Sequence, residues 1–160
     1  MVSHLLPPGA ETLRIVEHML LLPHVFERLD ASFVGYWNIY CFFNLIMAGR
    51  VFVFGSFDEK DGRLLGICWG EFSKSEFIAH AAYERGADAA GGIRQCREAL
   101  RKHFPQTKAV VCILPDSNRA IRRTVKRIGF RCEGPAASCF LTDRAGTRHP
   151  CIRYTLNLED

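Results

Sequence analysis

The stretch with the clearest chemical potential is residues 76–92, EFIAHAAYERGADAAGG. Its first half is strand-like, and it then turns through small residues into a predicted helix that ends near His103. A strand that turns into a helix in this way directs several backbone N–H groups toward one point, and proteins bind phosphate with such groups. The stretch therefore predicts an anion-binding turn at the start of the helix.

A second turn of similar design follows a buried-looking strand at residues 108–115. The helix after it runs to Gly129-Phe130, where Gly ends the helix and Phe buries the returning chain. Asn118 stands at the start of this helix, where its side chain can cap the first turn, and Asp116 or Ser117 can fill the same role. The sequence thus contains two strand-to-helix turns in succession.

The two turns together resemble the GNAT superfamily of acyl-CoA-dependent N-acyltransferases, over residues 50–157. Members carry an Arg/Gln-x-x-Gly-x-Gly/Ala loop, which Arg85, Asp88 and Ala90 match except that Asp88 replaces the middle Gly. Members also carry an Asn that opens a helix closing with Gly-Phe, which Asn118 matches. The resemblance implies an acyltransferase with acetyl-CoA as co-substrate, a primary amine as acceptor and no metal ion.

The same resemblance implies a single α+β domain over residues 1–160, with a mixed central sheet and helices on both faces. It assigns N-terminal helices to residues 9–49, a coenzyme-binding core to residues 50–134 and a C-terminal hairpin to residues 135–160. In the family, two central parallel strands diverge and the pantetheine arm lies between them. No short strand is predicted before the first helix here, and in this respect the chain is similar to pared-down GNAT-like proteins of phage and prophage origin.

The resemblance implies that the backbone does most of the coenzyme binding. His80, Ala81 and Ala82 would line the pantetheine arm with their backbone, and Asn118 would hydrogen-bond it. The dipole of the following helix would add attraction for the pyrophosphate. The loop that would hold the pyrophosphate comprises Arg85, Gly86, Ala87, Asp88, Ala89, Ala90 and Gly91.

Asp88 has two opposing interpretations. A carboxylate aimed into a phosphate-binding turn would repel an anionic coenzyme. Asp is also among the best residues for capping a helix N-terminus, and capping would occupy amides that phosphate needs. Gly91 and Gly92 can provide an alternative turn, at about 1 kcal/mol each in helix propensity relative to Ala. A close contact between helix and sheet explains the glycine pair equally well.

The chemistry expected of the family needs few side chains, because a thioester is already activated and needs an oriented amine, proton removal and oxyanion stabilisation. Glu71 and His80 are the candidate bases, and a pKa of about 6.5 suits histidine for this task. Tyr83 and Tyr154 are candidate acids. Each also has a structural interpretation, as a solvated strand end, a core histidine or packed aromatic rings. Many family members carry a Tyr seven residues after the Asn, where this chain has Val125.

Periodicity predicts the elements that position these motifs. Apolar residues at helical spacing predict a helix over Gly9–Leu29, which Pro23 ends or kinks. A second helix at residues 38–48 is apolar nearly all round, so we expect it to pack on both sides and to stop at Gly49.

Strand signals follow the two helices. Residues 50–57 and 63–72 flank an Asp-Gly turn and predict a hairpin, which the strand Glu76–Ala82 continues. Residues 138–143 and 151–158 predict a final hairpin. A strand-helix-strand crossover between these parts requires parallel neighbours, so the sheet is predicted to be mixed.

Length and composition set broad limits. At 160 residues and 48% hydrophobic, the chain can bury one core. Its longest apolar stretch, Ile39–Met47, is about half of the roughly 20 residues that a membrane span needs. No basic leader precedes it, so we expect a cytoplasmic protein without membrane association.

Seven cysteines without a Cys-x-x-Cys pair argue against a zinc site and a disulfide framework, and core filling is expected for at least five.

The net charge of +4 is concentrated on two predicted helices. Such runs are either solvated helix faces or an attractive surface for a polyanion, namely coenzyme A phosphates or nucleic acid. Nucleic acid is the weaker choice, because no aromatic residues interleave with the charges to stack bases. The charged residues are Arg94, Arg97, Arg101 and Lys102 on the first helix, and Arg119, Arg122, Arg123, Lys126 and Arg127 on the second.

Two functional hypotheses from different classes follow. The leading one is an acyl-CoA-dependent N-acyltransferase, and the alternative is a catalytically inactive GNAT-like binding or assembly protein, which Asp88 and Val125 favour. The acceptor cleft would come from the first helices and the final hairpin, where Phe33, Tyr36, Trp37 and Trp69 either wall the cleft or belong to the core. The exposed edges of the final hairpin make a homodimer a further expectation.

Overall fold

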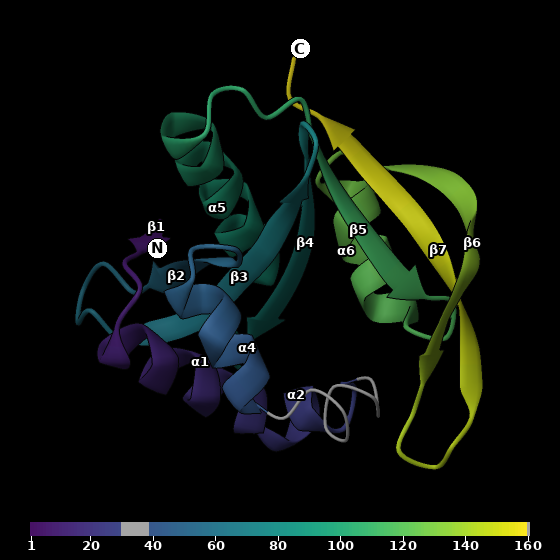
Figure 1. The fold of residues 1–160 in the computed structure, drawn as a ribbon, viewed down its shortest axis with the longest axis horizontal. Helices are drawn as coiled ribbons and strands as arrows, with labels where there is room; N and C mark the ends of the chain where they lie inside the picture. The colour runs from purple at the N-terminus through teal and green to yellow at the C-terminus, as the bar shows by residue number, and fades with distance from the viewer. Residues whose placement is uncertain (30–38, 160) are drawn as a thin grey trace.

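The computed structural model describes residues 1–29 and 39–159 and shows a seven-stranded mixed sheet between two layers of helices (Figure 1). The strands lie in the order β1-β2-β3-β4-β5-β7-β6. They are β1 (Val2–Leu6), β2 (Phe52–Phe57), β3 (Leu64–Ser73), β4 (Glu76–Tyr83), β5 (Ala109–Pro115), β6 (Arg131–Thr142) and β7 (Arg148–Asn157). The helices are α1 (Ala10–Leu21), α2 (Pro23–Phe26), α4 (Ile39–Met47), α5 (Ala89–His103) and α6 (Arg119–Arg127).

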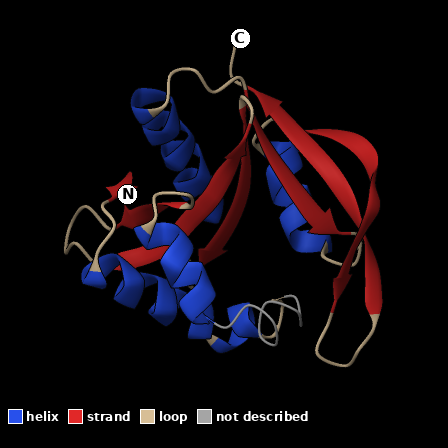
Figure 2. Cartoon of the chain, in the orientation of Figure 1, coloured by secondary structure: helices blue, strands red, loops and turns tan. Residues whose placement is uncertain are grey.

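Each face of the sheet carries its own apolar core. On one face, α1 and α4 bury residues such as Val16 and Ile46 against Ile67 of β3. On the other face, α5 and α6 pack over residues such as Phe77 and Tyr154. Figure 2 shows the helices distributed around the sheet in this way. The predicted α+β architecture, with helices on both faces of a mixed sheet, is confirmed.

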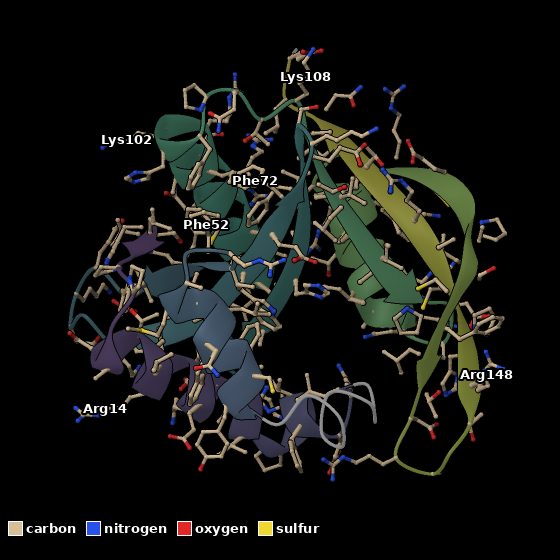
Figure 3. The ribbon with its side chains drawn as sticks, in the orientation of Figure 1. Arg14, Phe52, Phe72, Lys102, Lys108 and Arg148 are labelled. Carbon is tan, nitrogen blue, oxygen red and sulfur yellow. The ribbon has the colours of Figure 1, made fainter. Side chains whose placement is uncertain are left out.

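The parallel pair β4–β5 is joined only at its start. Glu76 pairs with Ala109, and the last pair joins Ile78 to Val111. Beyond that point β4 keeps β3 as its neighbour and β5 keeps β7. The strands therefore diverge toward their carboxyl ends and form a V, which Figure 1 shows between β4 and β5. Lys108, labelled in Figure 3, marks the closed end of this V.

Several predicted boundaries are confirmed. Pro23 ends the first helix and becomes the first residue of α2, a position that suits a residue without an N–H group. Gly49 follows α4 with a φ of +68°, the left-handed conformation that glycine adopts readily after a helix. The strands β2 and β3 form the predicted antiparallel hairpin.

Two expectations about the N-terminal region are wrong. A short strand, β1, does precede the first helix and pairs with β2. Only Leu6 among its five residues is buried, so the pattern of apolar side chains did not indicate a strand there. Helix α4 packs on one side only. Phe42 and Ile46 are buried, whereas Tyr40 is 69% exposed and Met47 is 52% exposed.

The final hairpin is longer than predicted. Strand β6 begins at Arg131 and continues through Gly134 and Pro135, which read as strand breakers in the sequence. Register shifts in its pairing with β7 accommodate these residues.

Within the described residues, no helix has the length and apolar character that crossing a membrane requires.

Candidate functional site

The open end of the V brings two helix N-termini together. Strand β4 leads through the loop of residues 84–88 into α5, and β5 leads through residues 116–118 into α6. Because the carboxyl ends of parallel strands lie at the same edge, both helices start at the mouth of the V (Figure 1). Their N-terminal dipoles favour a negatively charged ligand there.

The loop before α5 leaves several backbone amides available. The amide of Ala89 donates to the Ala87 carbonyl at 2.9 Å. By contrast, no acceptor within the described residues takes the N–H of Gly86, Asp88 or Ala90. Unpaired N–H groups in one short turn form the kind of concavity that binds phosphate. The loop therefore has unpaired amides where the sequence predicts an anion-binding turn, and anion binding there stays a prediction.

Gly86 sets the direction of this loop. Its φ of +82° lies in the left-handed region, where a side chain is disfavoured. Arg85 beside it is exposed at the mouth of the V. Farther back along β4, Ala81 is exposed and Ala82 is buried against the core of α1 and α4. Ala90, in the first turn of α5, is buried on the side of the helix that faces the sheet.

Asp88 acts as the N-cap of α5. Its Oδ1 accepts a hydrogen bond from the Gly91 amide at 2.9 Å. The cap occupies that amide and leaves those of Gly86, Asp88 and Ala90 without an acceptor among the described residues. A Cβ on Gly91 would collide with the Asp88 carboxylate, and one on Gly92 would collide with the Tyr83 ring. Close packing therefore explains the glycine pair.

Tyr83 lies beneath α5 and not in the V. Its hydroxyl is 3.1 Å from Ser56 Oγ and 3.4 Å from Cys68 Sγ. Burial, reinforced by the neighbouring thiols, raises the pKa of Tyr83 far above its ordinary value. Close contact with Cys68 lowers the pKa of the Cys96 thiol. This polar cluster fastens α5 to the sheet, and it holds the Tyr83 hydroxyl away from the mouth of the V.

Asn118 and Tyr154 also have clear structural partners. Asn118 caps α6, with its Oδ1 3.4 Å from the Ile121 amide. Tyr154 is fully buried, and its hydroxyl accepts a hydrogen bond from Arg122 Nε at 2.9 Å. Val125 stands where many family members carry a Tyr. It is 4% exposed and packs in the same core as Tyr154. The position seven residues after Asn118 therefore carries a packed aliphatic side chain and no acid.

Glu71 and His80 lie on the opposite face of the sheet, with α1 and α4. Trp69 pairs with His80 across β3 and β4, and Glu71 pairs with Ile78. Glu71 and His80 are therefore diagonal neighbours, whose Cβ atoms are about 7–8 Å apart in such an arrangement. Both are exposed. Trp69 itself is 8% exposed and belongs to the core, so it forms the floor beneath His80.

The His80 ring stacks on Trp69 at a centroid distance of 5.5 Å. Desolvation by the neighbouring protein lowers the pKa of His80 below its ordinary value. The side chain is also exposed to solvent. His80 is neutral at neutral pH and can accept a proton.

An ion cluster on the same face was not predicted from the sequence. Arg153 Nη2 binds both carboxylate oxygens of Glu76 at 2.9 Å, and its Nε binds Glu133 at 2.8 Å. The cluster joins β4, β6 and β7 across β5, and it braces the closed end of the V. No sequence signal links three residues so far apart along the chain.

The predicted walls of the acceptor cleft meet at the mouth of the V. The Arg144 guanidinium, at the tip of the final hairpin, lies 3.5 Å from the centroid of the Phe26 ring in α2. His24 of α2 donates to the Tyr83 carbonyl at 2.8 Å, which fixes α2 against the end of β4. The other predicted cleft residues, Phe33, Tyr36 and Trp37, lie outside the described residues.

The basic residues divide between two places. Arg119, Arg122, Arg123 and Lys126 line a hollow along α6. Since Arg122 reaches Tyr154 of β7, this face of α6 turns toward the final hairpin. Arg94 and Arg97 of α5 instead border an apolar cavity between α5 and α6.

The cysteines fill the core less completely than expected. Four are buried, Cys139 is half-buried, and Cys41 and Cys132 are exposed. Among the described residues, no group of three or more His, Cys, Asp or Glu side chains is arranged to hold a metal ion.

Comparison by sequence finds no matching protein-family model and no matching curated protein. Comparison by structure does find relatives. A GNAT-family acetyltransferase from Bacillus anthracis has a TM-score of 0.73 at 12% identity, over 100% of this chain and 97% of that one. A ribosomal L7/L12 alpha-N-protein acetyltransferase in complex with coenzyme A has a TM-score of 0.73 at 13% identity, over 99% and 96% of the two chains.

A ribosomal-protein-S5-alanine acetyltransferase from Vibrio fischeri is also similar, with a TM-score of 0.70 at 11% identity, over 99% of this chain and 93% of that one. The structural neighbours are thus N-acetyltransferases of the GNAT class, and this chain has the GNAT fold. Identities of 11–13% establish the fold alone.

Proposed function

We propose that this protein transfers an acyl group, acetyl in the simplest case, from a coenzyme A thioester to a primary amine. The observation that carries the proposal is the V between β4 and β5, which has two helix N-termini and a set of unpaired amides at its open end. The helix N-termini and amides suit an anionic group, and the space between the strands suits a narrow, extended chain. Coenzyme A has both.

The phosphates would bind at the loop before α5, on the amides of Gly86, Asp88 and Ala90. The pantetheine arm would then run back along β4, whose backbone has no β5 partner beyond Ile78. At about 3.3 Å per residue, the five residues from Glu84 back to Ala79 span roughly 16 Å. This path would deliver the thioester beside Ala79 and His80.

His80 is the proposed general base. It lies on the face lined by α1 and α4, so an amine that enters from this side meets the imidazole beside the thioester. The amine nitrogen bonds to the carbonyl carbon while neutral His80 takes its proton. The bond from carbon to sulfur then breaks, and the thiolate receives a proton as the amide product leaves.

Glu71 is proposed to attract the acceptor. The structure records no ion pair for its carboxylate within the described residues, and it lies diagonally across from His80. A carboxylate at this distance favours approach of an ammonium group, which releases one proton to water to become the free amine. His80 then takes the second proton as the amine attacks the thioester. Two of the structural neighbours are named for acetylating ribosomal proteins. We accordingly propose a primary amine, with the peptide N-terminus as the first acceptor to test.

The test is a thiol-release assay with acetyl-CoA and three amines: a peptide with a free N-terminus, a lysine-containing peptide with a blocked N-terminus, and a polyamine. The proposal predicts thiol release that depends on both protein and amine, together with saturable stabilisation by coenzyme A in thermal melts. At 100 times its dissociation constant, a ligand adds about 2.7 kcal/mol of stability. Absence of both thiol release and stabilisation at millimolar coenzyme would refute the proposed function.

A further inference from the structure

An apolar cavity of about 40 Å³ lies between α5 and α6, above the closed end of the V. Strands β2 to β5 and β7 form its floor, α5 forms one side, and Ile128 and Phe130, which directly follow α6, form the other. Its lining includes Cys68, Phe77, Ala79, Ile93, Leu100 and Val110. Arg94 is exposed and also borders the cavity, so it marks the side nearest solvent.

Ala79 places this cavity next to the proposed position of the thioester. It is the first β4 residue beyond the last pair with β5, and its side chain faces the core of α5 and α6. His80, the next residue, faces the other side of the sheet, because side chains alternate along a strand. The cavity and the proposed base therefore lie on opposite faces of one strand, at the same height in the V.

We propose that this cavity is a subsite for the acyl chain, which takes the carbons of a short linear acyl group such as propionyl or butyryl. The inference rests on the proposed acyl transfer and specifies its donor. The amine nitrogen attacks the carbonyl carbon from the His80 side, a bond from carbon to nitrogen forms, and the bond from carbon to sulfur breaks. The thiolate leaves with the electron pair and gains the proton that the amine loses. The tail stays in the cavity unchanged.

The cavity volume limits the chain length. A water-sized sphere needs about 10–15 Å³ of such space, so 40 Å³ holds about three atoms the size of a carbon. Each methylene moved from water into apolar surroundings contributes about 0.8 kcal/mol, which is about fourfold in affinity. Butyryl, with two more methylenes than acetyl, should therefore bind about fifteenfold more tightly. An octanoyl chain exceeds the space and should lose this gain.

The experiment compares dissociation constants by calorimetry for coenzyme A and its acetyl, propionyl, butyryl and octanoyl thioesters. No acceptor amine is needed. Affinity that rises from acetyl to butyryl and falls at octanoyl supports the subsite. Affinity that is flat or falls steadily from acetyl onward overturns it while leaving the proposed function intact. Failure of every thioester and of coenzyme A to bind overturns the proposed function as well.

Two variants locate the effect. Ala79→Val adds two methyl groups to the wall and should remove the preference for butyryl over acetyl, a loss of about fifteenfold, since each buried methylene is about fourfold. Ile93→Val removes one methylene and should move the preferred chain one carbon longer. The matched control is Ile152→Val, the same change in the same core outside the cavity lining. An identical chain-length profile in all three variants contradicts the assignment.

Discussion

The substitution Asp88→Asn separates the two roles that the Asp88 carboxylate has at the start of α5. The side chain accepts a hydrogen bond from the Gly91 amide, and asparagine caps helices as well as aspartate does. The variant therefore keeps the cap and removes one negative charge. Aspartate also interacts favourably with the helix dipole, so we expect a stability loss of about 0.3–1 kcal/mol, a small change in melting temperature.

The effect on coenzyme binding follows from Coulomb's law. A phosphate oxygen on the Ala90 amide would lie close to the carboxylate that binds the adjacent Gly91 amide. Two unit charges about 4 Å apart repel each other by about 1 kcal/mol in water. Removing the carboxylate should therefore tighten coenzyme A binding about fivefold in low salt. At 1 M salt, where the Debye length is about 3 Å, the gain should almost disappear.

The assay is calorimetric titration of coenzyme A at low and high salt. The control is Glu159→Gln, which removes the same charge beside Lys108 at the closed end of the V. This control should change affinity far less, because the charge is distant and exposed. Equal affinities for the wild type and Asp88→Asn in low salt would refute phosphate binding at the start of α5.

Four further outcomes are expected. Replacing the proposed base, His80→Gln, should lower kcat about 10²–10⁴-fold at unchanged coenzyme affinity. Because desolvation lowers the pKa of His80, kcat/KM of the wild type, calculated on the concentration of free amine, should fall on the acid side only below about pH 6.5, and a fall that starts above this value contradicts the assignment. Asn118→Ala should destabilise the protein by about 1 kcal/mol in urea, through loss of the α6 cap, and an unchanged midpoint would argue against that cap. Gly92→Ala should cost about 1–3 kcal/mol, since its Cβ collides with Tyr83, and an unchanged melting temperature would contradict this packing.

Local signals predicted much of the fold. Three boundaries depend only on residues next to them, so they could be predicted from the sequence. They are the hairpin turn at the Asp-Gly pair between β2 and β3, the helix end at Pro23 and the helix end at Gly49. Strand β1 could not, because it is held by backbone pairing with β2, some fifty residues away in sequence. The one-sided packing of α4 was missed for a related reason. An apolar helix face indicates burial only when another element is present to cover it.

The candidate site was predicted in outline and not in its contacts. The loop, its small residues and Asn118 were identified from their resemblance to GNAT motifs, and the structure places them at the mouth of the V. The position of Tyr83 beneath α5 depends on Gly92, which leaves room for its ring, and on Ser56, which bonds its hydroxyl. The bridge from Arg153 to Glu76 likewise joins residues 77 positions apart. Such pairings arise only from tertiary structure.

The central claim is that coenzyme A binds in the V with its phosphates on the loop before α5. The most direct test is a nitrogen-15 NMR titration of the protein with coenzyme A, which follows each backbone amide separately. The account predicts saturable shifts that are largest at Gly86, Asp88 and Ala90, with a second group along β4 from Ala79 to Ala82. Shifts confined to the basic face of α6, or no shifts at millimolar coenzyme, would contradict it.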